Sequence, residues 1–137
     1  MRHLLLTGHS KISEGIAAAV SFVLGIDLPY FNAYVDGEEL FKDRMIREIE
    51  KIPESDDIII ATDIFGGSVN NEMMQLLNKP NVYLVSGMNM ALVAALAMAE
   101  EEEDTEQLIR SAIGQAKEGI IFCNDALQTD AQDLDDF

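Results

Sequence analysis

Two residues of this sequence have side chains suited to nucleophilic or acid–base chemistry, His9 and Asp63, and each follows a stretch with the composition of a strand. Histidine is a common nucleophile or base because it titrates near neutral pH. A carboxylate that accepts the N–H of one imidazole nitrogen fixes the tautomer and leaves the other nitrogen free to attack. We therefore expect a His9–Asp63 pair. His3, the only other histidine, is expected at a strand edge or the surface.

A glycine turn follows Asp63 in the run Asp63-Ile64-Phe65-Gly66-Gly67-Ser68. Paired glycines let a backbone turn sharply and approach a ligand closely. Ser68 is expected to cap a following helix, whose first N–H groups would then point towards the end of the strand and favour an anion. The sequence thus predicts an anion-binding turn beside the carboxylate.

Strand-like and helix-like patterns alternate along the chain. The run from Ile58 to Ala61 is apolar without alternation, as expected of a strand covered on both faces of a parallel sheet. Other strands are expected at 3–7, 30–35, 81–86 and 120–123, and helices at 12–24, 41–52, 69–77, 90–99 and between a cap at Asp104 and Gly119. Gly25 should end the first helix, and Asp36-Gly37 should form a turn. The alternation predicts a single doubly wound α/β domain with a mainly parallel central sheet flanked by helices.

The carboxyl ends of parallel strands meet at one edge of the sheet, where such folds bind ligands. Three strand ends would meet there, and their small or polar residues are expected to line the site: Gly8, His9 and Ser10; Asp63, Gly66, Gly67 and Ser68; Gly87 and Asn89. For Ser10 we favour capping of the first helix over contact with a phosphate.

Composition excludes several classes of function. The formal charge of -16 opposes nucleic acid and anionic membranes as partners. The chain has no run of about 20 apolar residues and no convincing signal peptide, so we expect a cytoplasmic protein. Two histidines and one cysteine supply a metal site poorly, and no dinucleotide or ATP motif occurs. Cys123 lies in an apolar stretch and is expected to be a buried, inert thiol.

The order and spacing of three motifs resemble the enzyme IIA component of the mannose-type sugar phosphotransferase system. The motifs are Leu5 to His9, Asp63 to Ser68 and Val85 to Asn89, and the resemblance covers residues 1–125. It implies that His9 is phosphorylated by the phosphocarrier HPr and passes the group to an enzyme IIB. It further implies that Asp63 orients the ring, that Gly67 and Ser68 bind phosphate oxygens, and that no metal or organic cofactor is used.

The resemblance also implies a homodimer in which a carboxy-terminal edge strand, here Gly119 to Asn124, is exchanged between subunits. Enzyme IIB would be a separate chain, and membrane association would occur only through permease subunits. Residues 126–137 form an acidic tail, and the part from Gln128 onward matches nothing in the family. The sequence departs from the family pattern at two places. Ser10 stands where many relatives have glycine, and Val69-Asn70 changes the first turn of the helix after the glycine turn.

Alternative functions remain. A dihydroxyacetone kinase phosphoryl donor subunit resembles the same fold and uses a comparable histidine, but the Asp-Ile-Phe-Gly-Gly-Ser form favours the sugar system. A non-catalytic regulatory binding domain would keep the fold without phosphoryl transfer, and the presence of both His9 and Asp63 argues against it. In a third interpretation both are ordinary loop residues of a structural subunit. The sequence does not name the sugar.

Overall fold

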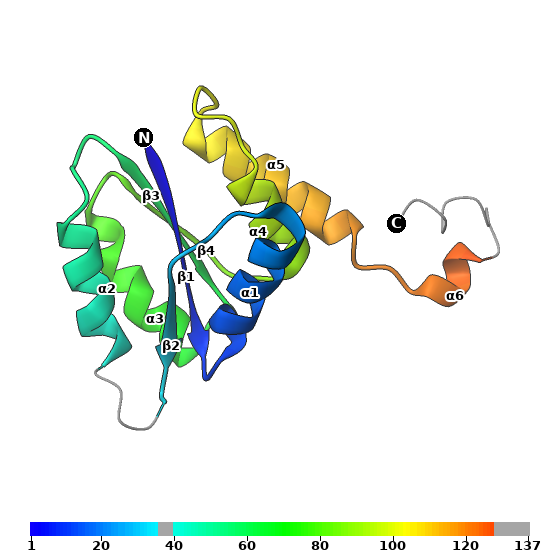
Figure 1. Ribbon diagram of the computed structural model, residues 1–137, viewed down its shortest axis with the longest axis horizontal. Coiled ribbons are helices and arrows are strands. Elements are labelled where there is room, and N and C mark those ends of the chain that lie inside the picture. The colour runs from blue at the N-terminus through cyan, green and yellow to red at the C-terminus, as the bar shows by residue number, and fades with distance from the viewer. Residues whose placement is uncertain (36–39, 128–137) are drawn as a thin grey trace.

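One parallel sheet forms the centre of the molecule. A computed structural model describes residues 1–35 and 40–127. Its strands are β1 (Arg2–His9), β2 (Tyr30–Ala33), β3 (Asp57–Thr62) and β4 (Val82–Val85), in the order β2-β1-β3-β4 and all parallel. Figure 1 shows the sheet between two layers of helices. The expected doubly wound α/β domain is confirmed.

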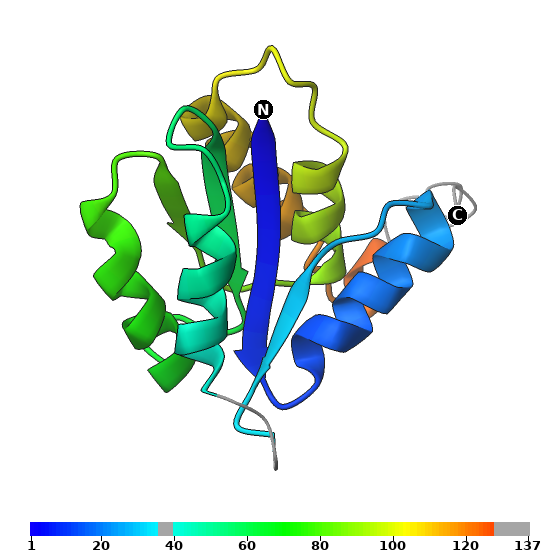
Figure 2. The same cartoon turned by 60° about the vertical axis from the view of Figure 1, so that its left-hand side comes forward.

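Helices cover both faces of the sheet. On one face lie α2 (Phe41–Glu50), α3 (Ser68–Met74) and the short 3₁₀ helix η1 (Gln75–Asn78) that continues α3; on the other lie α1 (Ile12–Leu24), α4 (Met90–Ala97) and α5 (Thr105–Glu118) (Figures 1 and 2). Gly25 ends α1 with a left-handed backbone, φ 69°. The Asp104 side chain caps α5 by accepting the N–H of Gln107 at 3.1 Å. Both ends agree with the sequence prediction.

Strand β3 supplies both halves of the core. Ile58 and Ile60 pack with α2 and α3, whereas Ile59 and Ala61 pack with the helices of the opposite face. All four side chains are completely buried. Each fully buried isoleucine contributes about 1.5–3 kcal/mol through the hydrophobic effect. The uninterrupted apolar run therefore reflects a strand with no solvent face, and it fixes the position of Asp63 at its end.

The two expected serine caps are wrong. Lys11 occupies the N-cap of α1 and Gly67 that of α3, and neither helix has a side-chain cap bond. Ser10 has a left-handed backbone, φ 52°, rather than the extended conformation usual at an N-cap. Ser68 is already the first residue of α3, and its hydroxyl contacts other side chains instead.

The expected strand at 120–123 is also wrong within this chain. After Gly119 the chain leaves the body of the molecule, and a short helix α6 (Cys123–Ala126) follows (Figure 1). Cys123 is exposed, because the projecting segment has no core of its own chain to pack against. The expected turn at Asp36-Gly37 and residues 128–137 of the acidic tail lie outside the described residues.

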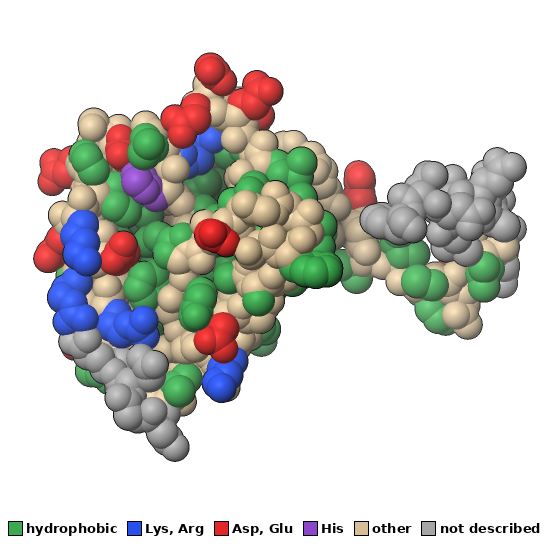
Figure 3. All heavy atoms as spheres, viewed as in Figure 1, with side chains coloured by type: hydrophobic (Ala, Val, Ile, Leu, Met, Phe, Trp, Pro, Cys, Tyr) green, Lys and Arg blue, Asp and Glu red, His purple; other side chains and the backbone are tan. Residues whose placement is uncertain are grey.

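Charge is distributed unevenly over the surface. Figure 3 shows acidic side chains gathered over the turn between α4 and α5, where residues 100–104 are exposed, and basic side chains over α2. None of the helices in the described ranges is long and apolar enough to cross a lipid bilayer.

Candidate functional site

The strand order reverses beside β1. The chain passes from β1 to β2 on one side and later returns to place β3 on the other side. Thr7 of β1 is in register with Thr62 of β3, so the residues after them emerge together at the carboxyl edge of the sheet. Open α/β sheets bind ligands at such a switch point. His9 and Asp63 therefore lie at the expected position for a ligand.

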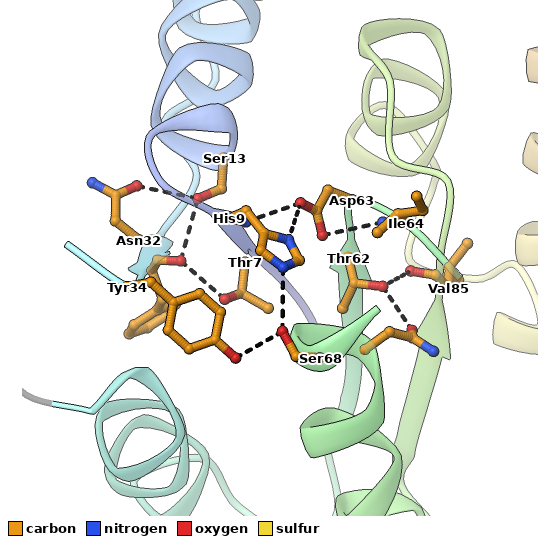
Figure 4. Close-up of polar contacts among 12 residues, drawn as sticks. Thr7, His9, Ser13, Asn32, Tyr34, Thr62, Asp63, Ile64, Ser68 and Val85 are labelled. Atoms are coloured by element: carbon orange, nitrogen blue, oxygen red, sulfur yellow. Dashed lines mark hydrogen bonds and ion pairs between the residues drawn. The ribbon is translucent and has the colours of Figure 1, made fainter. Parts of the chain in front are cut away.

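The side chains of His9 and Asp63 contact each other directly. Asp63 Oδ2 lies 2.8 Å from His9 Nδ1 and also accepts the backbone N–H of His9 at 2.9 Å (Figure 4). Asp63 Oδ1 accepts the N–H of Ile64 at 3.1 Å. The side chain of Asp63 is 8% exposed and that of His9 is 41% exposed. A buried, fixed carboxylate thus holds an imidazole that solvent or a partner can reach.

This contact assigns the protons of the imidazole. A carboxylate accepts hydrogen bonds, so Nδ1 carries the proton and Nε2 of the neutral ring has a free lone pair. Nε2 faces Ser68 Oγ at 3.2 Å. The ring can therefore act as a nucleophile through Nε2 while Nδ1–H remains bound to Asp63.

The bonds from His9 also determine the charge state of Asp63. Burial raises the pKa of this carboxyl, but hydrogen bonds from the backbone and ring of His9 outweigh burial and hold the pKa below its ordinary value. Asp56, before β3 at the opposite end of the sheet, also has a lowered pKa, chiefly because of its hydrogen bond with His3 at 3.0 Å. Asp63 is thus kept ionised, as an orienting carboxylate must be.

The lowered pKa of Asp63 predicts a pH dependence of stability. The stabilisation is complete above the unfolded-state pKa of about 3.9 and is lost as pH falls through the lower folded-state pKa. On acidification from about pH 5 to pH 3, the wild type should therefore lose more unfolding free energy than Asp63→Asn. Urea denaturation at several pH values measures this difference, with Asp125→Asn at an exposed position as control. Equal acid-induced losses in wild type and Asp63→Asn would contradict the assignment.

Two glycines allow the close approach of these groups. A Cβ on Gly8 would lie 2.6 Å from Ile12 Cγ2 and 3.1 Å from Asp63 Cγ. A Cβ on Gly67 would lie 2.7 Å from Ile64 Cγ2 and 3.5 Å from His9 Cε1. The glycine turn therefore passes beside the imidazole, as expected of a backbone that approaches a ligand. Gly66 has φ +78°, which favours glycine.

The other expected site residues lie at the same edge but have structural contacts. The Ser10 N–H donates to a backbone carbonyl of β2 at 2.8 Å. Asn89 Oδ1 caps α4 by accepting the N–H of Leu92 at 2.8 Å, and Gly87 forms a left-handed turn, φ +84°. Across residues 1–35 and 40–127, no hydrogen bond joins the side chains of Ser10 or Asn89 to His9.

Sequence reasoning missed Tyr34. Its hydroxyl donates to Ser68 Oγ at 2.9 Å, and its ring lies 5.5 Å from the imidazole of His9 between centroids (Figure 4). The sequence predicts Tyr34 within a strand at 30–35, but β2 ends at Ala33. The available signal was its position after a strand that neighbours β1, which places it at the same edge as His9.

The site does not have the composition of a metal centre. In the part of the chain that the structure describes, no three His, Cys, Asp or Glu side chains gather to hold a metal ion. The polar groups at the strand ends are instead an imidazole, a carboxylate, two hydroxyls and the backbone of a glycine turn.

The fold and the site therefore define a class of protein, a doubly wound α/β domain with a histidine–carboxylate pair at its switch point. Residues 3–113 match the family model EIIA-man, described as the PTS system fructose IIA component. A search of curated proteins found no match. The chain belongs to this EIIA family and is an EIIA-type component of a sugar phosphotransferase system.

Solved structures agree with this assignment. A protein from Klebsiella pneumoniae subsp. pneumoniae, described as a phosphoenolpyruvate-dependent sugar phosphotransferase system permease, is 35% identical over 92% of this chain and 93% of its own, with a TM-score of 0.84. An EIIA component from Streptococcus agalactiae is 19% identical over 91% and 99% of the two chains, with a TM-score of 0.79. A mannose/sorbose-specific IIA subunit from Enterococcus faecalis is 18% identical over 88% and 92%, with a TM-score of 0.73. The last two support the fold alone.

Proposed function

We propose that this protein is a cytoplasmic histidine phosphocarrier, which accepts a phosphoryl group from phospho-HPr on His9 Nε2 and passes it to an enzyme IIB. The observation that carries the proposal is the 2.8 Å contact between His9 Nδ1 and Asp63 Oδ2, which leaves Nε2 as the nucleophilic nitrogen. Membrane association would occur only through the permease subunits that enzyme IIB serves.

The transfer step conserves electrons and protons. The Nε2 lone pair forms a bond to phosphorus while the phosphorus–nitrogen bond of phospho-HPr breaks, and that electron pair remains on the donor nitrogen. The His9 ring keeps its Nδ1 proton, and the Asp63 carboxylate offsets the positive charge on the substituted ring. The same steps in reverse deliver the group to enzyme IIB. Catalysis then consists of positioning and charge stabilisation, which requires neither nucleotide nor metal.

Groups at the glycine turn would bind the phosphoryl oxygens. The first N–H groups of a helix have no partner within the helix and favour anions. In α3 these belong to the turn at Gly67 and Ser68, beside the imidazole. The Ser68 hydroxyl is 3.2 Å from Nε2 and could turn to a phosphoryl oxygen. Ser10 is exposed at the same edge and is proposed as a further contact.

We further propose a homodimer in which the segment 119–124 pairs with a second copy. Ile120, Ile121 and Phe122 are 76%, 59% and 67% exposed, an unfavourable state for consecutive apolar side chains. β4 is an edge strand of the sheet, and a groove beside it is lined mainly by apolar side chains: Leu77, Val82, Tyr83, Leu84, Ile109 and Ile113, with Glu106 and Arg110. An added strand there would cover the edge and the apolar segment together.

Truncation before Gly119 should therefore weaken the dimer while the body of the domain stays folded. The removed segment contributes nothing to the three clusters that form the core. Sedimentation velocity over a range of concentrations measures the change, and a matched chain truncated after residue 127 should remain dimeric. A stable dimer of the shorter chain would exclude the exchange.

The direct test of phosphoryl transfer is intact mass spectrometry. The wild type would be incubated with phosphoenolpyruvate, enzyme I and HPr, and a family relative would show that the donors are active. The expected result is one added phosphoryl group that is labile in acid, as expected of a phosphohistidine. No added mass with active donors would favour the regulatory binding domain.

A further inference from the structure

Tyr34 lies beside the His9 imidazole, although the two residues come from different strands. Tyr34 follows β2, His9 ends β1 and Asp63 follows β3. Its ring contacts the imidazole at 5.5 Å between centroids and packs edge-on against Phe41 at 5.6 Å, with an interplanar angle of 78°. Its hydroxyl bonds to Ser68 Oγ at 2.9 Å (Figure 4). The residue is thus held by packing on one side and by a hydrogen bond on the other.

The backbone of Tyr34 supports a specific role. Its φ of 62° lies in the left-handed region, which costs a non-glycine residue free energy. The only other non-glycine residue with positive φ in the described ranges is Ser10, at the same edge of the sheet. Strained backbone of this kind persists where the surrounding contacts hold it, and it clusters at functional sites. Here the strain accompanies a side chain that reaches the site.

Hydrogen-bond direction along this group follows from the proton on Nδ1. Nε2 of the neutral ring can only accept, so Ser68 must donate its single hydroxyl proton to it. Ser68 Oγ can then accept, and the Tyr34 hydroxyl is its donor. The chain therefore runs from Tyr34 through Ser68 to His9, and hydrogen bonds in such a chain strengthen one another.

We propose that Tyr34 is a positioning residue for phosphoryl transfer, whose hydroxyl fixes the Ser68 hydroxyl so that it donates first to His9 Nε2 and then to the incoming phosphoryl group. This rests on the proposed phosphocarrier function. Before transfer, the Ser68 hydroxyl donates its proton to the Nε2 lone pair in a hydrogen bond. This hydrogen bond must break before Nε2 can bond to phosphorus. As phosphorus approaches, the hydroxyl turns by rotation about its C–O bond to a phosphoryl oxygen, while Tyr34 still donates to Ser68 Oγ.

The kinetic test compares Tyr34→Phe, Ser68→Ala and the double variant. Tyr34→Phe keeps the ring contacts and removes only the hydroxyl, and it should lower the transfer rate about 3- to 10-fold, the range for loss of one hydrogen bond. In the Ser68→Ala background the same change should have no further effect, because Tyr34 acts through Ser68. Tyr30→Phe, which removes a hydroxyl from the opposite end of β2, is the matched control and should match wild type.

A spectroscopic readout tests the hydrogen-bond chain without any transfer. In ¹⁵N NMR spectra of the unphosphorylated protein at a pH where His9 is neutral, loss of a donor to Nε2 moves its resonance away from the protonated-nitrogen region. Tyr34→Phe should move the Nε2 resonance part of the way to its position in Ser68→Ala, whereas Tyr30→Phe should leave it unchanged. An Nε2 resonance of Tyr34→Phe at the wild-type position would overturn the proposal, even if the protein never accepted phosphate.

A small phosphoryl donor separates positioning from partner docking. Tyr34 is 60% exposed, so its hydroxyl could instead contact HPr. With phosphoramidate as donor, the positioning role predicts the same fractional loss in Tyr34→Phe as with phospho-HPr. A loss seen only with HPr, or independent losses that multiply in the double variant, would overturn the proposal. Failure of the wild type with both donors would refute the phosphocarrier function and leave the NMR result to decide the role of Tyr34.

Discussion

His9→Ala should take up no phosphoryl group from phospho-HPr under conditions that label the wild type completely. The substitution removes the imidazole whose Nδ1 contacts Asp63 and whose Nε2, the proposed nucleophile, contacts Ser68. The His9 side chain is 41% exposed and is not part of the buried core, so the variant should stay folded. Intact mass measures the uptake, and circular dichroism measures the fold.

His3→Ala is the matched control for this loss. His3 is the other histidine of the chain, and it bonds to Asp56 at the amino end of the sheet, away from the strand ends that carry His9. This variant should be labelled as fully as the wild type. If labelling persisted in His9→Ala but disappeared in His3→Ala, the phosphoryl group would be on His3 at the amino end of the sheet. That result would refute the proposed site.

Asp63→Ala should slow phosphoryl transfer roughly 10- to 100-fold, the range found when a group that orients a metal-bound histidine is removed. The Nε2 nucleophile remains, so labelling should still reach completion at long times. Loss of the carboxylate frees the ring to adopt the other tautomer, in which Nε2 carries the proton and cannot attack. Rapid-quench measurements of the transfer rate detect the effect.

Asp63→Asn separates orientation from charge. Its amide oxygen can still accept the Nδ1 proton, but it cannot offset the charge on the phosphorylated ring. If orientation dominates, Asp63→Asn should be faster than Asp63→Ala; if charge dominates, the two variants should be equally slow. A rate equal to wild type in Asp63→Ala would show that the 2.8 Å contact has no part in transfer.

Local signals in the sequence were sufficient for the alternating elements and for the site's central pair. The apolar run at 58–61 has one explanation in a protein of this size, a strand buried on both faces, and its burial is complete. Parallel strands then bring their carboxyl ends to one edge, so two residues far apart in sequence are expected at the same edge. Gly25 and Asp104 likewise mark helix ends through local backbone geometry.

The last segment of the chain shows where a local pattern is insufficient. An apolar, β-branched run such as Ile120-Ile121-Phe122 predicts a strand, but a strand needs a neighbour to bond with. Within this chain the segment leaves the body after Gly119, and its side chains stay exposed. In the proposed dimer this segment would pair with a second copy, which no pattern in the segment itself encodes.

The sequence by itself therefore determined the layered fold and the edge at which His9 and Asp63 lie, because these follow from strand burial and strand direction. Only the tertiary structure decided the partners of Ser68. A serine after two glycines has the composition of a helix cap, yet its hydroxyl bonds to Tyr34 and His9. A hydroxyl rotates to bond with the acceptor and donor within reach, and strands β1 and β2 place His9 and Tyr34 beside it.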